Sequence, residues 1–339
     1  MRESVRACGA ICVALVWLAL GGTATAGPWK QYEPHVYDVQ AGPGVTSQGW
    51  ISDFHEPLAG TIADSPYFVL EGAEPGGTLF VLGGTHPSEP SGIVAAILLV
   101  ETAVVQRGRL VVVPYGNSLA MTPDERAKLI QTETGERRLV HGIRRSLLHL
   151  HEPDPDGRYR SPTGGSWNPN EARNLNRIWP GLPHGTGTEQ IGYAITEIIR
   201  HYQADVAMDL HEALDPWGTL AWTLAGTNDH DALIREASRR ANAGLELDLI
   251  APRFISDTTT SMSMAEWEAA TGVIGLLTET VRDSHTPIHT RVGIQIEFVT
   301  GLLNAFNAEH PDRAVQLGGV PGYLQIRAHG MDSFFLPAQ

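Results

Sequence analysis

Short apolar runs alternate with longer apolar stretches along most of the chain. Two of the short runs, 78–82 (TLFVL) and 110–113 (LVVV), are rich in β-branched residues and bounded by turn residues, as is typical of strands buried on both faces. The predicted strands are 78–82, 110–113, 206–210 and 273–277, and the predicted helices are 92–105, 190–201, 231–243 and 291–308. Ser91 is available as a cap for the first helix. The alternation predicts an α/β sheet with helices on both faces.

Two segments interrupt this pattern. Residues 150–188 are dense in Pro, Gly, Asp and Asn, and a loop of that length inside a compact domain is usually functional or disordered. Trp167, Trp179 and paired arginines in this loop argue against simple disorder. Residues 313–339 are Gly-rich with scattered apolar positions, and the sequence does not indicate their role.

The first residues have the pattern of a secretory leader. Arg2 and Arg6 precede an apolar stretch at 10–20, and Ala24-Thr25-Ala26 is a small-x-small cleavage pattern. The alternative is a membrane anchor, but the apolar stretch is shorter than the roughly 20 residues that span a bilayer. We therefore predict a signal peptide at 1–26, a mature protein exported to the periplasm, and no membrane span once the leader is removed.

Composition narrows the classes of partner and of chemistry. Both cysteines, Cys8 and Cys12, lie in the predicted leader, so the mature chain has no thiol for a disulfide or a thiolate metal site. A formal net charge of −14 argues against nucleic acid or anionic lipid as a partner. With 42% hydrophobic and 18% charged residues, the chain has the composition of a globular protein.

Residues that bind metals or move protons follow three of the predicted strands. His86 and Glu89 follow the first, His211 follows the third, and Glu279 follows the fourth. In open α/β sheets, ligands bind at the carboxyl ends of the strands. Two imidazoles and one carboxylate form a zinc ligand set that leaves a fourth position open. Zinc suits this set better than calcium, and manganese, cobalt or iron fit it as well.

Each of these features also has an ordinary structural interpretation. A His-x-x-Glu segment often occurs by chance and fits a polar turn between a strand and a helix. Asp209 shares a strand face with His211 and fits a hydrogen-bond partner for a buried histidine, and Glu279 taken alone fits an exposed carboxylate. Their order at three strand ends (ligand pair, ligand, carboxylate) favours a site.

The long loop contains a segment suited to binding a carboxylate. Residues 173–181 (RNLNRIWPG) place arginines and amides close together. With this segment the chain resembles the zinc carboxypeptidase superfamily, most closely the succinylglutamate desuccinylase/aspartoacylase family. The resemblance rests on four motifs in the family's order: Gly83-Gly84-x-His86-x-x-Glu89, Asn174-Leu-Asn-Arg followed by Ile-Trp-Pro-Gly, Asp209-x-His211 and Thr278-Glu279-Thr280.

The resemblance implies a fold and a metal site. The expected fold is an α/β three-layer sandwich with a central mixed, mostly parallel sheet flanked by helices. The catalytic domain is expected at 27–312, followed by the tail at 313–339. His86, Glu89 and His211 are implied as the ligands of one zinc ion per chain.

The resemblance also implies roles for residues around the metal. Glu279 is expected to be the general base and later the general acid. Asn176 and Arg177 are expected to bind a substrate carboxylate. The family uses an arginine to stabilise the oxyanion; Arg158, Arg160 and Arg173 are the candidates here, and we prefer Arg173.

Two departures from the family pattern affect the surroundings of the ligands. The usual aspartate before Leu-Asn-Arg is Asn174, so its role in orienting a ligand is expected to be missing or supplied elsewhere, for instance by Asp209. Pro87-Ser88 replaces the small residues that commonly separate the first two ligands. Neither departure removes a ligand.

The activity implied is that of a secreted, zinc-dependent deacylase. It would cleave an N-acyl amino acid or a similar carboxylate-bearing amide with a metal-activated water. The alternative enzyme is a metallocarboxypeptidase or peptide amidase acting on extracellular or cell-wall peptides, and the alternative of another class is a catalytically silent binding protein on the same fold. A serine or cysteine hydrolase is disfavoured, because the mature chain has no cysteine and no Gly-x-Ser-x-Gly elbow.

Overall fold

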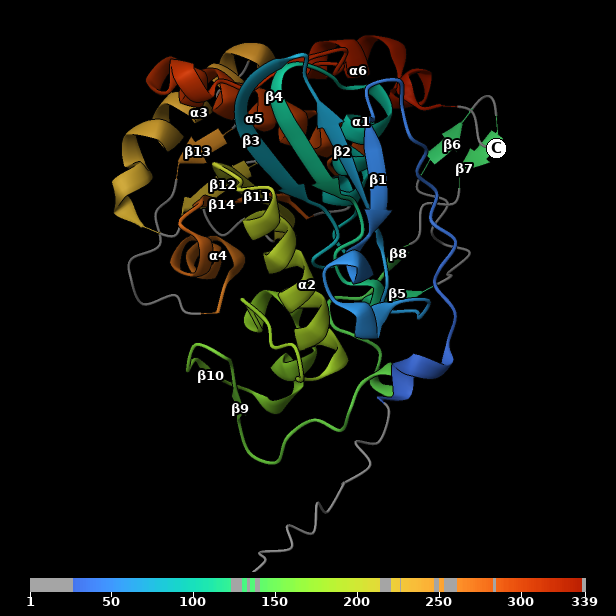
Figure 1. Cartoon of the computed structure of the whole chain (residues 1–339). Helices are drawn as coiled ribbons and strands as arrows, with labels where there is room; N and C mark the ends of the chain where they lie inside the picture. The colour runs from blue at the N-terminus through green and yellow to red at the C-terminus, as the bar shows by residue number, and fades with distance from the viewer. Residues whose placement is uncertain are drawn as a thin grey trace, which may run out of the picture.

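The computed structural model describes residues 27–122, 130–132, 135–137, 141–213, 221–225, 227–246, 250–252, 261–282 and 285–336. Within these residues a nine-stranded sheet forms the central layer (Figure 1). Its strands are β1 (Ser47–Trp50), β2 (Pro66–Glu71), β3 (Glu74–Leu82), β4 (Val104–Val113), β11 (Val206–Ala213), β12 (Ala221–Ala225), β13 (Ile250–Pro252), β14 (Ile274–Val281) and β15 (Gln316–Gly318). The helices are α1 (Pro90–Thr102), α2 (Gly187–His201), α3 (Asp231–Leu245), α4 (Ser263–Thr271), α5 (Ile288–Glu309) and α6 (Tyr323–His329).

The sheet is mixed, with a parallel centre. Its strand order is β1-β2-β4-β3-β11-β14-β12-β13, with β15 paired to β4. The central strands β4, β3, β11 and β14 run parallel, whereas β1, β2, β12 and β15 make antiparallel pairings around them. Parallel strands need crossover connections, which is why helices follow the central strands. The expected α/β class and mixed sheet are confirmed.

Side chains of the central strands alternate between two hydrophobic clusters. Leu79 and Val81 of β3 pack with residues of α1 and α5, whereas Phe80 and Leu82 pack with α2 and with Trp267 of α4. This period of two places one helical layer on each face of the sheet (Figure 1). Helix α1 is buried along nearly its whole length, as expected of a helix that is apolar on all sides.

Several predicted boundaries were wrong by a few residues. Ser91 lies inside α1 and is not its cap; Glu89 occupies the N-cap and Pro90 the first helical position, where its missing N–H costs nothing. The helix ends at Thr102 rather than at 105, because β4 already begins at Val104. Strand β11 continues three residues and β14 four residues beyond the predicted ends.

The long loop predicted between residues 150 and 188 is mostly irregular. It holds the short pair β9 (Tyr159–Arg160) and β10 (Ser166–Trp167), and the two 3-10 turns η7 (Pro169–Arg173) and η8 (Leu175–Arg177). Trp179 is fully buried, and its ring lies 4.9 Å from that of Trp267 in α4. This contact packs the end of the loop against α4, in the helical layer that α2 and α4 form on one face of the sheet. Shorter strand pairs are formed by β5 (Met121–Thr122) with β8 (His141–Gly142) and by β6 (Ile130–Thr132) with β7 (Gly135–Arg137).

The segment after residue 312 is part of the folded layers. Strand β15 pairs with β4, and helix α6 packs against α5, where Tyr323 covers Gly293. Glu297 of α5 accepts a hydrogen bond of 2.7 Å from the backbone N–H of Tyr323. The predicted leader at 1–26 lies outside the described residues, so its prediction stands untested. Among the described residues, no helix is both long enough and apolar enough to cross a membrane.

Candidate metal centre and active site

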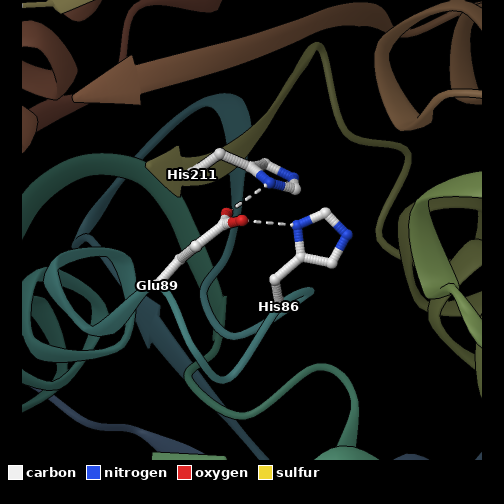
Figure 2. A group of neighbouring side chains, drawn as sticks. All are labelled: His86, Glu89 and His211. Atoms are coloured by element: carbon white, nitrogen blue, oxygen red, sulfur yellow. Dashed lines mark hydrogen bonds and ion pairs between the residues drawn. The ribbon is translucent and has the colours of Figure 1, made fainter. Parts of the chain in front are cut away.

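Three metal-ligating side chains converge at the carboxyl end of the parallel strands. Nδ1 of His86 lies 2.9 Å from Oε1 of Glu89, and Nδ1 of His211 lies 2.9 Å from Oε2 of the same carboxylate (Figure 2). The three ligand atoms all lie within 4.8 Å of one another, and the three side chains are only 1–2% exposed. The structure thus brings together the three residues that the sequence singled out.

Local sequence explains why the three side chains meet. His86 lies in the turn after β3, Glu89 caps α1, and His211 lies within β11. Gly92, in the first turn of α1, packs directly on β11, and a Cβ there would lie 2.3 Å from the carbonyl oxygen of Leu210. Only glycine allows this close approach, which carries Glu89 to within hydrogen-bond distance of His211.

The arrangement fits a divalent metal ion by its donor set and its spacing. Ligand atoms around tetrahedral zinc lie roughly 3.3 Å apart, because zinc–ligand bonds measure about 2.0–2.2 Å. The Glu89 contacts of 2.9 Å are therefore close to the spacing a metal requires. Both imidazoles direct Nδ1 toward the shared carboxylate, so the same edges of the two rings face a common point (Figure 2). A zinc ion held there by His86, Glu89 and His211 would keep one position open for water.

Burial and the neighbouring charges have opposite effects on the pKa of each residue in the cluster. Burial lowers the pKa of His86, against the raising effect of the Glu89 charge. Burial also disfavours protonated His211, but the charges and hydrogen bonds of Asp209 and Glu89 outweigh it and raise the pKa of His211 well above its usual value. The pKa of Glu89 falls well below its usual range: burial opposes this, and the two histidines overcome it. The carboxylate is thus held ionised, as a metal ligand must be.

A second set of polar groups holds the far edges of both imidazoles. Nε2 of His86 donates a 2.8 Å hydrogen bond to Oδ1 of Asn174, and Nε2 of His211 lies 2.8 Å from Oδ2 of Asp209. The expectation that position 174 has lost its orienting role is therefore wrong, because an amide oxygen accepts the same hydrogen bond that a carboxylate would. Asp209 supports the other histidine.

Glu279 lies next to the cluster on the neighbouring strand. In the parallel pair of β11 and β14 it is the register partner of His211, so both residues lie within strands and face the same side of the sheet. Its Oε2 atom is buried and has no hydrogen-bond partner among the described residues. Burial raises the pKa of Glu279 to about 8; the charge of His211 opposes this and that of Glu89 adds to it.

One arginine lies beside the cluster, and it was not among the sequence candidates. Nη1 of Arg144 lies 3.8 Å from Oε1 of Glu89, with a side chain 42% exposed. Arg173 instead donates hydrogen bonds to the carboxylate of Asp154 and to the carbonyl of Ser146. Within the described residues, Arg173 thus has its partners in Asp154 and Ser146, and Arg144 lies beside Glu89. The adjacent pair Arg144-Arg145 was the available signal in the sequence.

Asn176 and Arg177, the predicted carboxylate-binding pair, make different kinds of contact in the structure. The side-chain oxygen of Asn176 accepts a 3.0 Å hydrogen bond from the backbone N–H of Ser263, which ties the loop to the start of α4. The guanidinium of Arg177 lies 4.7 Å from the centre of the Trp167 ring, and it has a favourable electrostatic interaction with Glu279. Arg177 thus stacks on Trp167 and interacts electrostatically with Glu279, and at least one polar atom of Asn176 serves the fold.

Comparison with solved structures gives the class of fold. A metallo-carboxypeptidase from Burkholderia cenocepacia is matched with a TM-score of 0.51 and 11% identity over 79% of this chain and 66% of that one. The tripeptide-bound Cell Shape Determinant Csd4 protein from Helicobacter pylori is matched with a TM-score of 0.51 and 14% identity over 77% of this chain and 59% of that one. The chain therefore has a metallocarboxypeptidase-like fold, as its resemblance implied.

A further structural match lies nearer in sequence. A succinylglutamate desuccinylase/aspartoacylase from Rhodobacter sphaeroides aligns with 20% identity over 72% of this chain and 59% of that one, with a TM-score of 0.45. The chain thus spans between about 59% and 66% of the length of these three structures. No protein-family model and no curated protein sequence matches the chain.

Proposed function

We propose that the chain is a zinc-dependent amide hydrolase, a deacylase acting on an N-acyl amino acid or a similar carboxylate-bearing amide. The observation that carries the proposal is the convergence of His86, Glu89 and His211 with Glu279 in register beside them. Two imidazoles and a carboxylate suit zinc, and a neighbouring carboxyl whose Oε2 atom has no hydrogen-bond partner among the described residues suits proton transfer. A cluster that only stabilised the fold would not need the Glu279 carboxyl beside it.

The side chains divide the work of hydrolysis. Zinc at such a site supplies a Lewis acid and lowers the pKa of its water toward about 7. Glu279 accepts the proton from water and delivers it to the leaving amine, and a pKa raised by burial to about 8, with the charge of His211 opposing the rise, suits both steps. Arg144 stabilises the developing oxyanion, and Arg177 binds the substrate carboxylate.

The first test is the substitution Glu279→Gln. We expect the variant to keep one zinc per chain by elemental analysis and to lose turnover by about 10²- to 10⁴-fold, the usual contribution of a general acid–base. The chain is assayed from residue 27 on a panel of N-acyl amino acids. Full activity of the zinc-loaded variant would remove Glu279 from the mechanism, and absence of zinc from the unaltered protein would remove the proposal itself.

A matched pair of arginine variants in the same assay separates the two candidates for the oxyanion. Loss of one oxyanion donor costs on the order of 10²- to 10³-fold in kcat, so we expect that loss for Arg144→Ala. Arg173→Ala should leave kcat near that of the unaltered protein once folding is matched, because Arg173 is bonded to Asp154. The reverse ranking would return the role to Arg173.

A second candidate activity is that of a carboxypeptidase or peptide amidase. It is favoured by the two matches whose TM-scores reach 0.51, a metallo-carboxypeptidase and a protein solved with a bound tripeptide. Short peptides added to the same panel distinguish the two activities, since a deacylase splits an N-acyl amino acid into an acyl acid and an amino acid, whereas a carboxypeptidase splits a peptide into an amino acid and a shortened peptide. Either way, we infer a small molecule or short peptide with a carboxylate as substrate.

The proposed place of this chemistry is the periplasm. It rests on the leader pattern at 1–26 alone. Determining the N-terminal residue of the protein recovered from cells tests it: Gly27 is expected, and an intact Met1 would contradict export by cleavage.

A further inference from the structure

Behind His86 lies a chain of three side chains that leads away from the metal cluster. Nε2 of His86 bonds to Oδ1 of Asn174 at 2.8 Å, and Nδ2 of Asn174 donates to Oε2 of Glu171 at 2.5 Å. The other carboxylate oxygen of Glu171 is paired with Arg145. The backbone N–H of Asn176 donates a second hydrogen bond, of 3.0 Å, to Oδ1 of Asn174. Every polar end of the buried Asn174 amide is thus in use.

The orientation of this amide decides which nitrogen of His86 carries the proton. A neutral histidine that binds metal through Nδ1 must carry its proton on Nε2 and needs an acceptor there. A carboxylate accepts in any orientation, whereas an amide accepts on one side and donates on the other. If the Asn174 amide turned over, its NH₂ group would face Nε2, the proton would move to Nδ1, and the metal-binding edge of His86 would be blocked.

Glu171 and the backbone N–H of Asn176 both oppose this reversal, and Glu171 is the one that a substitution can remove. An ionised carboxylate only accepts hydrogen bonds, so a reversed amide would put its oxygen against the Glu171 oxygen. Burial raises the pKa of Glu171, but the hydrogen bonds from Arg145 and Asn174 and the charges of Arg145 and Arg177 outweigh burial and lower it, which favours the ionised carboxylate. We propose that Glu171 is a positioning residue, two side chains away from the metal, that holds the Asn174 amide in the orientation that leaves Nδ1 of His86 free to bind zinc. The inference rests on the proposed metal site.

A double-mutant cycle between Glu171 and Asn174 tests this directly. Glu171→Ala should weaken zinc binding by about ten-fold, the lower end of what the loss of an outer partner costs. In an Asn174→Asp background position 174 accepts in either orientation, so Glu171→Ala should cost nothing there, or strengthen binding by removing a neighbouring carboxylate. Zinc dissociation constants are measured by competition with a chromophoric chelator. An equal cost in both backgrounds, or a change below two-fold in the first, overturns the proposal.

A spectroscopic readout separates this role from general support of the fold. In ¹⁵N-histidine spectra of the zinc-loaded protein, where Nδ1 of His86 would bind the metal instead of donating to Glu89, we expect the Nε2–H tautomer of His86 in the unaltered chain and a mixture in Glu171→Ala. Glu236→Ala, which removes surface ion pairs with Arg239 and Arg240 on α3, is the matched control and should change neither readout. An unchanged tautomer in Glu171→Ala overturns the inference even if zinc binds. Failure of the unaltered protein to bind zinc would instead overturn the proposed function.

Discussion

The two histidines of the cluster present the same edge to Glu89 but are supported by different chemistry. His211 has a carboxylate behind it, with Asp209 Oδ2 at 2.8 Å, whereas His86 has an amide, with Asn174 Oδ1 at 2.8 Å. Asp209 is two residues from His211 on the same strand, while Asn174 is 88 residues from His86. Strand alternation by itself places Asp209 on the same side as His211. Asn174 reaches His86 only once the long loop has folded onto the sheet.

The difference changes the charge of the site without changing its geometry. A carboxylate makes the imidazole it touches a stronger ligand and adds one negative charge near the metal. An amide orients the ring and adds none. With Glu89, Asp209 and Glu279 already close together, a neutral residue at position 174 would limit the repulsion met by the carboxylate-bearing substrate that we propose. The neutral amide behind His86 would therefore repel an anion less than a carboxylate would. Its disadvantage is that it accepts a hydrogen bond from His86 in only one orientation, whereas a carboxylate accepts in either.

The largest expected effect comes from disrupting the contact between α1, which begins after Glu89, and β11, which contains His211. Gly92→Ala would place a Cβ 2.3 Å from the Leu210 carbonyl, so α1 must move and carry Glu89 away from His211. We expect a loss of about 1–3 kcal/mol of unfolding free energy and a fall in zinc affinity at or beyond the upper end of the roughly 10- to 100-fold range. Urea unfolding and chelator competition measure the two effects.

Gly301→Ala in α5 is the control for this variant. A Cβ at Gly301 would lie 2.6 Å from the Ala237 carbonyl, an equally tight backbone contact between α5 and α3. It should lower stability in the same way and leave the zinc affinity of the folded protein unchanged. Equal losses of zinc affinity in the two variants would show that packing in general, and not the approach of α1 to β11, controls the site.

An intermediate effect is expected from making the two supports alike. In Asp209→Asn the residue would accept from Thr85 with its oxygen, which leaves its NH₂ facing Nε2 of His211. Zinc affinity should fall by about 10- to 100-fold, and by more than in Asn174→Ala, because a charged acceptor is lost as well as an orientation. A smaller loss in Asp209→Asn than in Asn174→Ala would show that the amide, and not the carboxylate, is the stronger support.

The smallest effect on zinc is expected from Thr85→Val. The Thr85 hydroxyl donates a 2.7 Å hydrogen bond to Oδ1 of Asp209, and thereby links the residue before His86 to the support of His211. Its removal should cost about 1.5–3 kcal/mol of stability, typical of a hydrogen bond to a charged group, with zinc affinity reduced less than in Asp209→Asn. Thermal unfolding of the metal-free protein measures the first quantity. A loss of zinc affinity as large as that of Asp209→Asn would mean that the hydroxyl alone orients the carboxylate.

Sequence reasoning reached those parts of the site that are encoded locally. His86, Glu89, His211 and Glu279 were found because hydrophobic runs mark the strands whose ends meet at one edge of the sheet. The runs also indicated the helices on both faces. Strand lengths were underestimated, because β11 and β14 continue through polar residues that only their pairing and burial make part of the sheet.

Other parts of the site depend on segments that no local pattern connects. Arg144 lies far from both ligand motifs in sequence, and the arginine beside it at 145 does not connect it to either motif. The segment after residue 312 lacked a clear strand signal, yet β15 is held by its partner β4. Short strands of this kind are stabilised by pairing rather than by their own propensity.

The sequence by itself determined the alternation of strands and helices, the kinds of ligand, and their order along the chain. Only the tertiary structure decided which edge of each imidazole faces Glu89, that the Asn174 oxygen supports His86, and that Arg144 lies beside the ligands while Arg173 is held by Asp154. The physical reason is that residue type and spacing set what a side chain is able to bind. Its direction and partners are set by packing between segments about a hundred residues apart, through contacts such as the approach of Gly92 to Leu210.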